Sequence, residues 1–281
     1  MPFGQVQGFF VDSCVLLPHQ SESIRKSCID FLKEAASRCS ICSSVKNEAF
    51  EVIDRAYGII VSDFRANLKP FREKNGIKEL TNRHGKTLAS FFSERKRSFK
   101  ITFPQRSNVR SEIIGAIENY VASQLHSLKD GVKIATDDFI ASMMTQLAIV
   151  EHDLKAPFMG LRLVEIKPNV QITSLIVLKA LIANPRDVEH LGSALEFQYK
   201  ENKWVIFVTT DDAEILSKER DMFEVFGLQC SKPEWALDYY RDMTRMKSPI
   251  EHFHETPNYT ERQKEFGKTI EKAMGIKILS L

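Results

Sequence analysis

Short apolar segments alternate with amphipathic helices at both ends of this sequence, and this alternation restricts the chain to few folds. Runs of β-branched and aromatic residues predict strands at 8–17 (GFFVDSCVLL), 40–44, 204–210 (WVIFVTT) and 228–230. Apolar residues at helical spacing predict helices over 24–35, 45–60, 175–182, 187–199, 213–226 and 234–243. Strands that are joined through helices pair in parallel. The sequence therefore predicts an α/β fold, a three-layer sandwich with a central parallel sheet.

The middle of the chain, 63–163, has a helical pattern almost throughout and is strongly basic. Between Arg65 and Arg110 there are thirteen Lys and Arg against three Glu and no Asp, a local net charge of +10 in a chain whose total is +2. This asymmetry is typical of a polyanion-binding element, and the alternative is a solvated face of a helical region. The candidate phosphate-binding residues are Arg95, Lys96, Arg97, Lys100 and Arg106.

The composition argues against export and against membrane insertion. The apolar start of the chain has no basic segment before it and is interrupted by Asp12, so we expect a strand and no signal peptide. No uninterrupted apolar run approaches the roughly 18 residues that a membrane helix needs. The five cysteines are an odd set, which favours reduced thiols in a cytoplasmic protein.

Acidic residues fall where the predicted strands end or the following helices begin. Asp12 interrupts the first strand, Glu48 lies early in the second helix, Asp187 opens a later helix, and Asp211 and Asp212 follow WVIFVTT directly. Ligands bind beyond the carboxyl ends of parallel strands, so we expect these side chains to share one edge of the sheet. An oxygen-rich cluster there suits Mg²⁺ or Mn²⁺. Without metal the cluster would repel itself, so Asp12→Asn should leave stability level or raise it.

Each acid also has a structural interpretation. Asp187 and Asp212 could be helix N-caps, and Glu48 could be a surface helix residue. Asp12 has no such simple alternative, because an unpaired carboxylate is costly to bury. His190, one turn after Asp187, could approach the site, but it is interpreted as a helix-packing residue. Cys39 and Cys42 are interpreted as structural cysteines.

Four of these segments together resemble the signature motifs of the PIN-domain nucleases. VDSCVLL is similar to the first motif, an Asp in the first strand followed by Ser or Thr, and Ser43–Glu48 to the second. DVEHLGSAL resembles the third, and FVTTDD, with Thr209-Thr210-Asp211, resembles the fourth. LQCSKPEWAL is similar to the last strand and helix of the family. The resemblance covers residues 6–60 and 170–245.

The resemblance implies a metal-binding quartet of Asp12, Glu48, Asp187 and Asp211, with Asp212 nearby and Thr209 as a supporting oxygen. Glu48 and Asp187 are 139 residues apart, much farther than in compact family members. The chain therefore resembles a large member with a helical insertion, rather than the small toxin ribonucleases. We expect a nuclease domain from 1–62 and 164–247, a helical insertion or cap at 63–163, and a C-terminal helical tail at 248–281.

The function implied by this resemblance is divalent-metal-dependent cleavage of RNA phosphodiester bonds by an endoribonuclease. RNA is the expected partner, a homodimer is the candidate assembly, and no membrane partner is expected. Two alternatives remain open at this stage. One is a non-catalytic RNA-binding or scaffold protein with a PIN-like fold. The other is a nucleotide-binding α/β protein, which the absence of a Gly-rich phosphate loop disfavours.

Overall fold

The computed structural model describes residues 7–19, 21–102, 108–165, 172–201 and 203–242. The chain divides into two compact units: unit 1 comprises residues 1–48 and 160–281, and unit 2 comprises residues 49–159. The sequence places these divisions at residues 62 and 164. The first division lies earlier than predicted, inside α3 (Ser43–Asn75). This helix begins at Ser43 and runs unbroken through residue 62, and its residues from Ala49 onward belong to unit 2.

Unit 1 is built on a five-stranded parallel sheet. Its strands, in the spatial order β5-β2-β1-β6-β7, are β1 (Gly8–Val11), β2 (Cys39–Cys42), β5 (Arg162–Val164), β6 (Val205–Val208) and β7 (Gln229–Ser231). Val11 pairs with Val208, and Val208 with Ser231, so the carboxyl ends of these three strands are level. Side chains that follow the strands therefore meet at one edge of the sheet.

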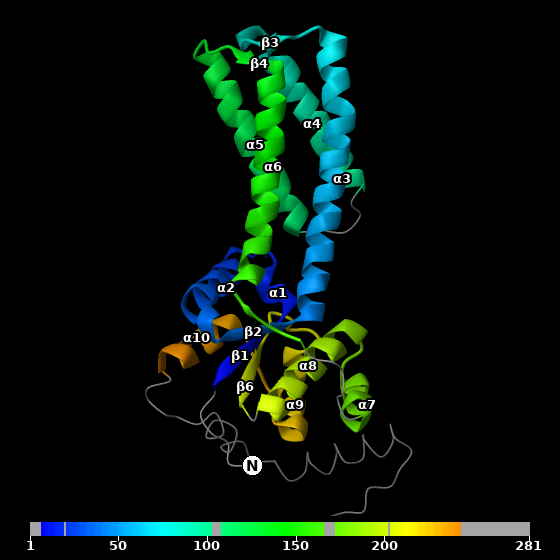
Figure 1. Cartoon of the computed structure of the whole chain (residues 1–281), viewed down its shortest axis with the longest axis vertical. Helices are drawn as coiled ribbons and strands as arrows, with labels where there is room; N and C mark the ends of the chain where they lie inside the picture. Colours follow the sequence, from blue (N-terminus) through cyan, green and yellow to red (C-terminus); the bar gives the residue numbers. More distant parts are fainter. Residues whose placement is uncertain (1–6, 20, 103–107, 166–171, 202, 243–281) are drawn as a thin grey trace, which may run out of the picture. The chain divides into compact units, whose positions relative to one another are not determined.

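Helices cover both faces of this sheet and make unit 1 a three-layer sandwich. Successive residues of β1 point to opposite faces. Phe9 contacts Phe31 of α2 (Glu22–Ala35) and Tyr240 of α10 (Pro233–Asp242), with ring centroids 5.2 and 6.4 Å apart. Phe10 contacts Phe197 of α8 (Pro185–Glu201) at 6.0 Å. Figure 1 shows α2 and α10 on one side of β1 and α8 on the other, which confirms the predicted fold class.

Strands β1 and β5 and the helix after β6 differ from the prediction. The run 8–17 forms a strand only to Val11, after which Asp12 caps the short helix α1 (Ser13–Leu16). β5 is only three residues long, two of them are exposed, and the sequence did not predict it. The segment 213–226 is helical only from residue 216, as a 3-10 turn followed by α9 (Glu219–Phe226). α7 (Ile172–Leu181) completes the helices of unit 1 within the described residues.

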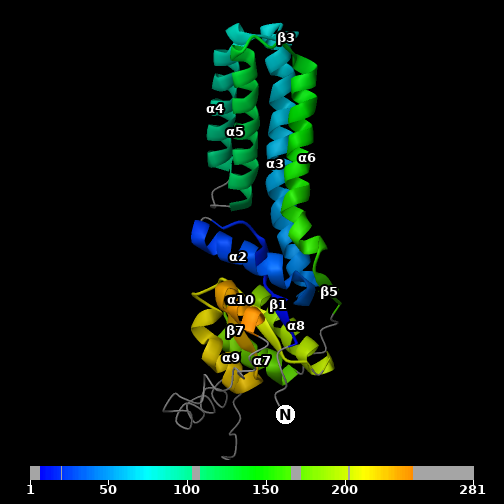
Figure 2. The ribbon, with the colours of Figure 1, turned by 90° about the vertical axis from the view of Figure 1, so that its left-hand side faces the viewer.

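Unit 2 consists of helices that run alongside one another (Figure 2). They are the greater part of α3, α4 (Gly85–Thr102), α5 (Asn108–Lys129) and α6 (Thr136–Met159). Side chains from several of them form a buried core, including Phe71, Leu88, Leu128 and Phe139. A short antiparallel pair, β3 (Glu79–Leu80) with β4 (Ile134–Ala135), was not predicted. α5 ends just before Gly131, the expected stop, whose φ of 85° is accessible to glycine at little cost.

Three further expectations concern the whole chain. None of the five cysteines, all of which lie within the described residues, forms a disulfide. In the part of the chain that the structure describes, no helix is both long enough and apolar enough to cross a bilayer. The expected helical tail at 248–281 lies outside the described residues.

A pair of glycine substitutions tests how tightly the sheet is assembled. A Cβ atom at Gly8 in β1 would lie 2.9 Å from the backbone oxygen of Arg38, so Gly8→Ala should destabilise the protein by about 1–3 kcal/mol. A Cβ atom at Gly115 in α5 would have no heavy atom within 4 Å, so Gly115→Ala should stabilise by about 0.5–1 kcal/mol. Urea unfolding measures both, and equal effects of the two variants would contradict the close approach at Gly8.

Candidate functional site

Asp12 is held at the carboxyl edge of the sheet, between β1 and α1. Its backbone N–H donates to the carbonyl of Val208 at 3.0 Å, which extends the pairing of β1 with β6. Its side chain is only 3% exposed, and its Oδ1 accepts from the backbone N–H of Ser13 at 2.7 Å. The N-cap geometry therefore both ends the strand and directs the carboxylate into the protein.

The other oxygen of Asp12 is bound by two side chains. The Thr209 hydroxyl donates to Oδ2 at 2.9 Å, and the Cys14 thiol does so at 3.0 Å. Burial and the nearby Asp12 charge raise the pKa of Cys14, so the thiol keeps its proton and acts as a donor. Thr209 also accepts from the backbone N–H of Asp211 at 3.1 Å. It thereby connects Asp12 to the turn that carries Asp211.

His190 bridges two of the predicted acids. Its Nδ1 lies 3.1 Å from Asp12 Oδ1 and its Nε2 lies 3.5 Å from Glu48 Oε2. The residue is 1% exposed. The sequence favoured a helix-packing role for His190, with an approach to the site as the alternative, because a residue three positions after Asp187 lies on the same helix face. The structure places His190 between Asp12 and Glu48.

The electrostatics of Asp12 and His190 favour an ion pair. Burial acts to raise the pKa of Asp12, but the hydrogen bonds from His190, Cys14 and Thr209 outweigh it and lower this pKa. Burial acts to lower the pKa of His190, and the hydrogen bond and charge of Asp12 outweigh it and raise this pKa. The folded protein thus favours ionised Asp12. This geometry argues against the expectation that Asp12→Asn relieves repulsion.

Glu48 is also neutralised within the protein. It lies near the start of α3, and its Oε1 accepts from the Arg186 guanidinium at 2.9 Å. The Ser13 hydroxyl donates to its Oε2 at 3.3 Å. Glu48 is thus brought to the same edge as Asp12, with a cation on each of its oxygens when His190 is protonated.

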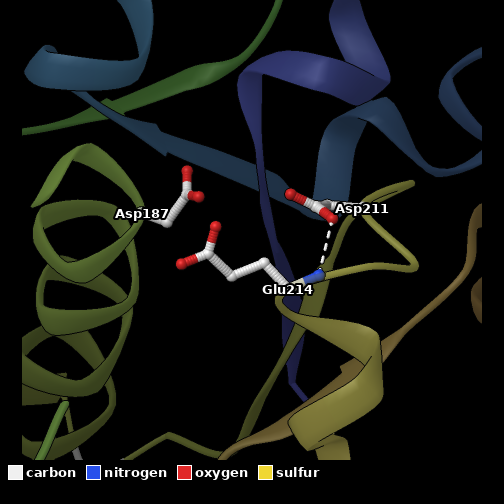
Figure 3. A group of neighbouring side chains, drawn as sticks. All are labelled: Asp187, Asp211 and Glu214. Carbon is white, nitrogen blue, oxygen red and sulfur yellow. Dashed lines mark hydrogen bonds between the residues drawn. The ribbon is translucent and has the colours of Figure 1, made fainter. Parts of the chain in front are cut away.

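The remaining predicted acids meet in a separate group. One carboxylate oxygen each from Asp187, Asp211 and Glu214 lie within 4.8 Å of one another, and no other such group of three occurs among the described residues. Figure 3 shows Asp187 extending from α8 toward Glu214, with Asp211 facing both from the turn after β6. Asp211 Oδ1 accepts from the backbone N–H groups of Ala213 and Glu214 at 3.0 and 2.9 Å. This turn therefore orients Asp211.

Asn184 connects the two sides of this group. Its side-chain amide donates to Asp187 Oδ2 at 2.9 Å, and its backbone N–H donates to Glu214 Oε1 at 2.7 Å. Burial raises the pKa of Asp187 to about 6, and the negative charges of Asp12, Asp211 and Glu214 add to this effect against the opposing charge of His190. The three carboxylates therefore form a site where a bound cation would relieve repulsion.

Glu214 was not among the metal ligands predicted from the sequence, whereas Asp212 was predicted and is not in the group of three. Asp211-x-x-Glu214 has the spacing of a helix cap, and this pattern conceals the second use of Glu214 as a carboxylate in the group. Asp212 is 62% exposed, and its carboxylate pairs with Lys232 at 2.8 Å. It therefore lies outside the group of three. Asp12 and Glu48 share His190, and the charge of Asp12 contributes to the raised pKa of Asp187.

The candidate RNA-binding cations whose side chains the structure describes are not one solvent-facing cluster. Arg95 pairs with Asp63 at 3.2 Å, and Lys96 pairs with Glu118, all within unit 2. Arg97 is exposed. The side chain of Lys100 and all of Arg106 lie outside the described residues. Of the three described cations, only Arg97 fits the predicted role without breaking an ion pair shown here.

Comparisons of the chain with protein-family models, with curated proteins and with solved structures found no match. The function is therefore inferred from the sequence motifs and from the geometry of the carboxylates.

Substitution of Asp187 tests the repulsion in the group of three. Its pKa is about 6 in the folded protein against an ordinary 3.8, so ionisation disfavours folding and stability is lost as the pH rises from about 4 through 6. Asp187→Asn should raise the free energy of unfolding of the metal-free protein at pH 7 by about 1–2 kcal/mol. This is less than the free energy that corresponds to the whole pKa shift, because solvent screens a half-buried group. The gain should vanish at pH 4. Urea unfolding at both pH values measures it.

The matched control is Asp212→Asn, which removes an exposed ion pair and should change stability by less than about 1 kcal/mol. A loss of stability in Asp187→Asn at pH 7 would contradict the account.

Asp12→Asn should have the opposite sign. It removes one partner of a buried ion pair, which costs about 3–5 kcal/mol. Because the pKa of Asp12 is lowered, its contribution is present above about pH 4 and is lost as the pH falls. Thermal unfolding at pH 7 measures the loss, and unchanged stability would show that the pair contributes nothing.

Proposed function

We propose that this chain is a divalent-metal-dependent endoribonuclease with a PIN-type nuclease domain in unit 1. The observation that carries the proposal is the group of Asp187, Asp211 and Glu214, whose oxygens lie within 4.8 Å of one another at the carboxyl edge of a parallel sheet. RNA is proposed as the substrate because the four sequence motifs resemble those of PIN nucleases. The free thiols of all five cysteines support a cytoplasmic location.

The residues present fit Mg²⁺ or Mn²⁺. All three groups are carboxylates, the hard ligands that these ions take at roughly 2.0–2.6 Å. Two ligands on opposite sides of one ion would then be about 4–5 Å apart, close to the observed upper limit of 4.8 Å. Burial and the charges of the neighbouring acids raise the pKa of Asp187, and the positive charge of a divalent ion would offset both effects.

Each part of the site has a role in this proposal. The metal ion would lower the pKa of an attacking water and neutralise charge on the phosphodiester. Asp12 and Glu48, held by His190, would keep the neighbouring face of the site negative and in place. Arg186 precedes Asp187 and extends to Glu48 with its side chain 56% exposed. It could hold a phosphate oxygen of the RNA beside the ion.

One observation favours an alternative, a non-catalytic RNA-binding or scaffold protein with a PIN-like fold. His190 and Arg186 already satisfy the charges of Asp12 and Glu48 without any metal. A chain that had lost its ion could retain such an arrangement. In that case RNA binding would be independent of metal, and no RNA would be cleaved.

Loss of single carboxylates tests the proposed centre. Asp187→Asn, Asp211→Asn and Glu214→Gln should each weaken Mn²⁺ binding at least tenfold, since even outer-shell changes cost about 10–100-fold. Cleavage of end-labelled RNA should fall at least as much. Asp212→Asn is the control for metal binding and should retain it, because Asp212 pairs with Lys232 and lies outside the group of three. Calorimetry and gel assays measure the two effects. Normal Mn²⁺ binding in all three variants would refute the centre.

The pH dependence of metal binding provides a second test. Protons compete with the ion for Asp187, whose pKa is about 6, so Mn²⁺ affinity should be level above pH 7. Below about pH 6 it should fall by about tenfold per pH unit. In Asp187→Asn this slope should be absent. An identical slope in the parent and the variant would assign the competing proton to another group.

A further inference from the structure

A cavity of about 570 Å³ lies along the edge strand of unit 1, beside the metal centre. Its wall combines residues from the turn after β6, from α9, from β7 and from the start of α10. The residues that matter for its chemistry are Asp212, Glu219, Gln229, Lys232, Glu234 and Trp235. Its size is typical of a site for a small ligand or for one residue of a polymer.

Gln229 contributes an unpaired acceptor to this wall. It is the first residue of β7 and is only 5% exposed. Its side-chain Oε1 is buried and has no hydrogen-bond partner among the described residues. A buried polar atom without a partner costs about 1–3 kcal/mol. If the side chain turns toward the cavity, a ligand that donates a hydrogen bond to Gln229 would recover this cost.

Trp235 contributes a planar surface. Its indole stacks on the ring of Tyr239, one turn along α10, with centroids 5.5 Å apart and an interplanar angle of 17°. The stacking restricts the indole, and Trp235 also lines the cavity. A restrained aromatic ring suits the stacking of a nucleobase, which contributes about 1–3 kcal/mol per base.

The charged groups of the wall accept more hydrogen bonds than they donate. Asp212, Glu219 and Glu234 carry carboxylates, whereas Lys232 is the one cation of the wall and is bound to Asp212. The matching ligand therefore presents several donors on one planar edge. Guanine does so with N1–H and N2–H₂ on its Watson–Crick edge, whereas the other RNA bases have fewer adjacent donors there.

We propose that this cavity binds an unpaired guanine base of the RNA substrate, stacked on Trp235 and hydrogen-bonded through Gln229 and the wall carboxylates. The assignment to substrate RNA rests on the proposed nuclease function. Asp212 lines the cavity and directly follows Asp211 of the metal centre. A base in the cavity thus belongs to a nucleotide next to the cleaved phosphodiester, and cleavage is selective for guanine at that position.

The test titrates metal-free protein with guanosine, adenosine, cytidine and uridine by ligand-observed NMR. Nucleosides are used so that no phosphate meets the wall carboxylates. Guanosine should bind at least about fivefold more tightly than the others. Gln229→Leu and Trp235→Leu should each weaken guanosine binding at least fivefold. Tyr199→Leu, which removes an exposed aromatic ring of α8, is the control and should leave it unchanged.

A purely structural role for Gln229 gives a different result. Gln229→Leu removes the unpaired oxygen, so the variant should fold with unchanged or higher stability while guanosine binding falls. Trp235→Phe keeps an aromatic plane and should retain part of the binding. Equal affinity for all four nucleosides, no binding, or full binding by Gln229→Leu would overturn the proposal. Preferential binding of an arginine-containing peptide would overturn it in favour of a protein partner.

The outcomes for the cavity and for the nuclease are separable, because nucleoside binding is measured without metal and without cleavage. Guanosine binding without RNA cleavage would retain the cavity and reject the nuclease. Mn²⁺-dependent cleavage without guanosine binding would reject only the cavity.

Discussion

The buried carboxylate of Asp12 is the charge on which the site in unit 1 depends. An uncompensated carboxylate at this depth would cost several kcal/mol. Here its oxygens accept from the Ser13 N–H, the Cys14 thiol, the Thr209 hydroxyl and His190. These donors come from α1, from the end of β6 and from α8, which meet only in the folded sheet. The same charge therefore fixes the turn after β6 and the position of α8, and so the places of Asp211 and Asp187.

The acidic residues at this edge of the sheet form two groups with different electrostatic surroundings. Asp12 and Glu48 receive their positive charge from His190 and Arg186. Asp187, Asp211 and Glu214 instead converge, and the pKa of Asp187 is raised. The ionised Asp12 increases that repulsion, because its own charge is held in place. The structure therefore contains a stabilised ion pair, Asp12 with His190, beside a group of carboxylates that repel one another. A divalent ion bound to that group is the simplest way to offset the repulsion.

The sheet, its helices and most of the acids could be predicted because their signals are local. Buried parallel strands such as β6 are continuous apolar runs, and acids at strand ends follow from chain order. β5 was not predicted because it is short and mostly exposed. Glu214 and the two contacts of His190 could not be predicted, because these contacts join segments that are distant in sequence. The pairing of the basic stretch could not be predicted for the same reason, since Asp63 and Glu118, which lie outside it, pair with Arg95 and Lys96.

The most direct test of the account is the position of a bound ion. In crystals of the full chain grown with Mn²⁺, anomalous diffraction should show one peak within roughly 2.0–2.6 Å of carboxylate oxygens from Asp187, Asp211 and Glu214. His190 should remain between Asp12 and Glu48. A peak bound by Asp12 and Glu48 with His190 displaced, or no peak at this edge in protein that cleaves RNA, would contradict the account.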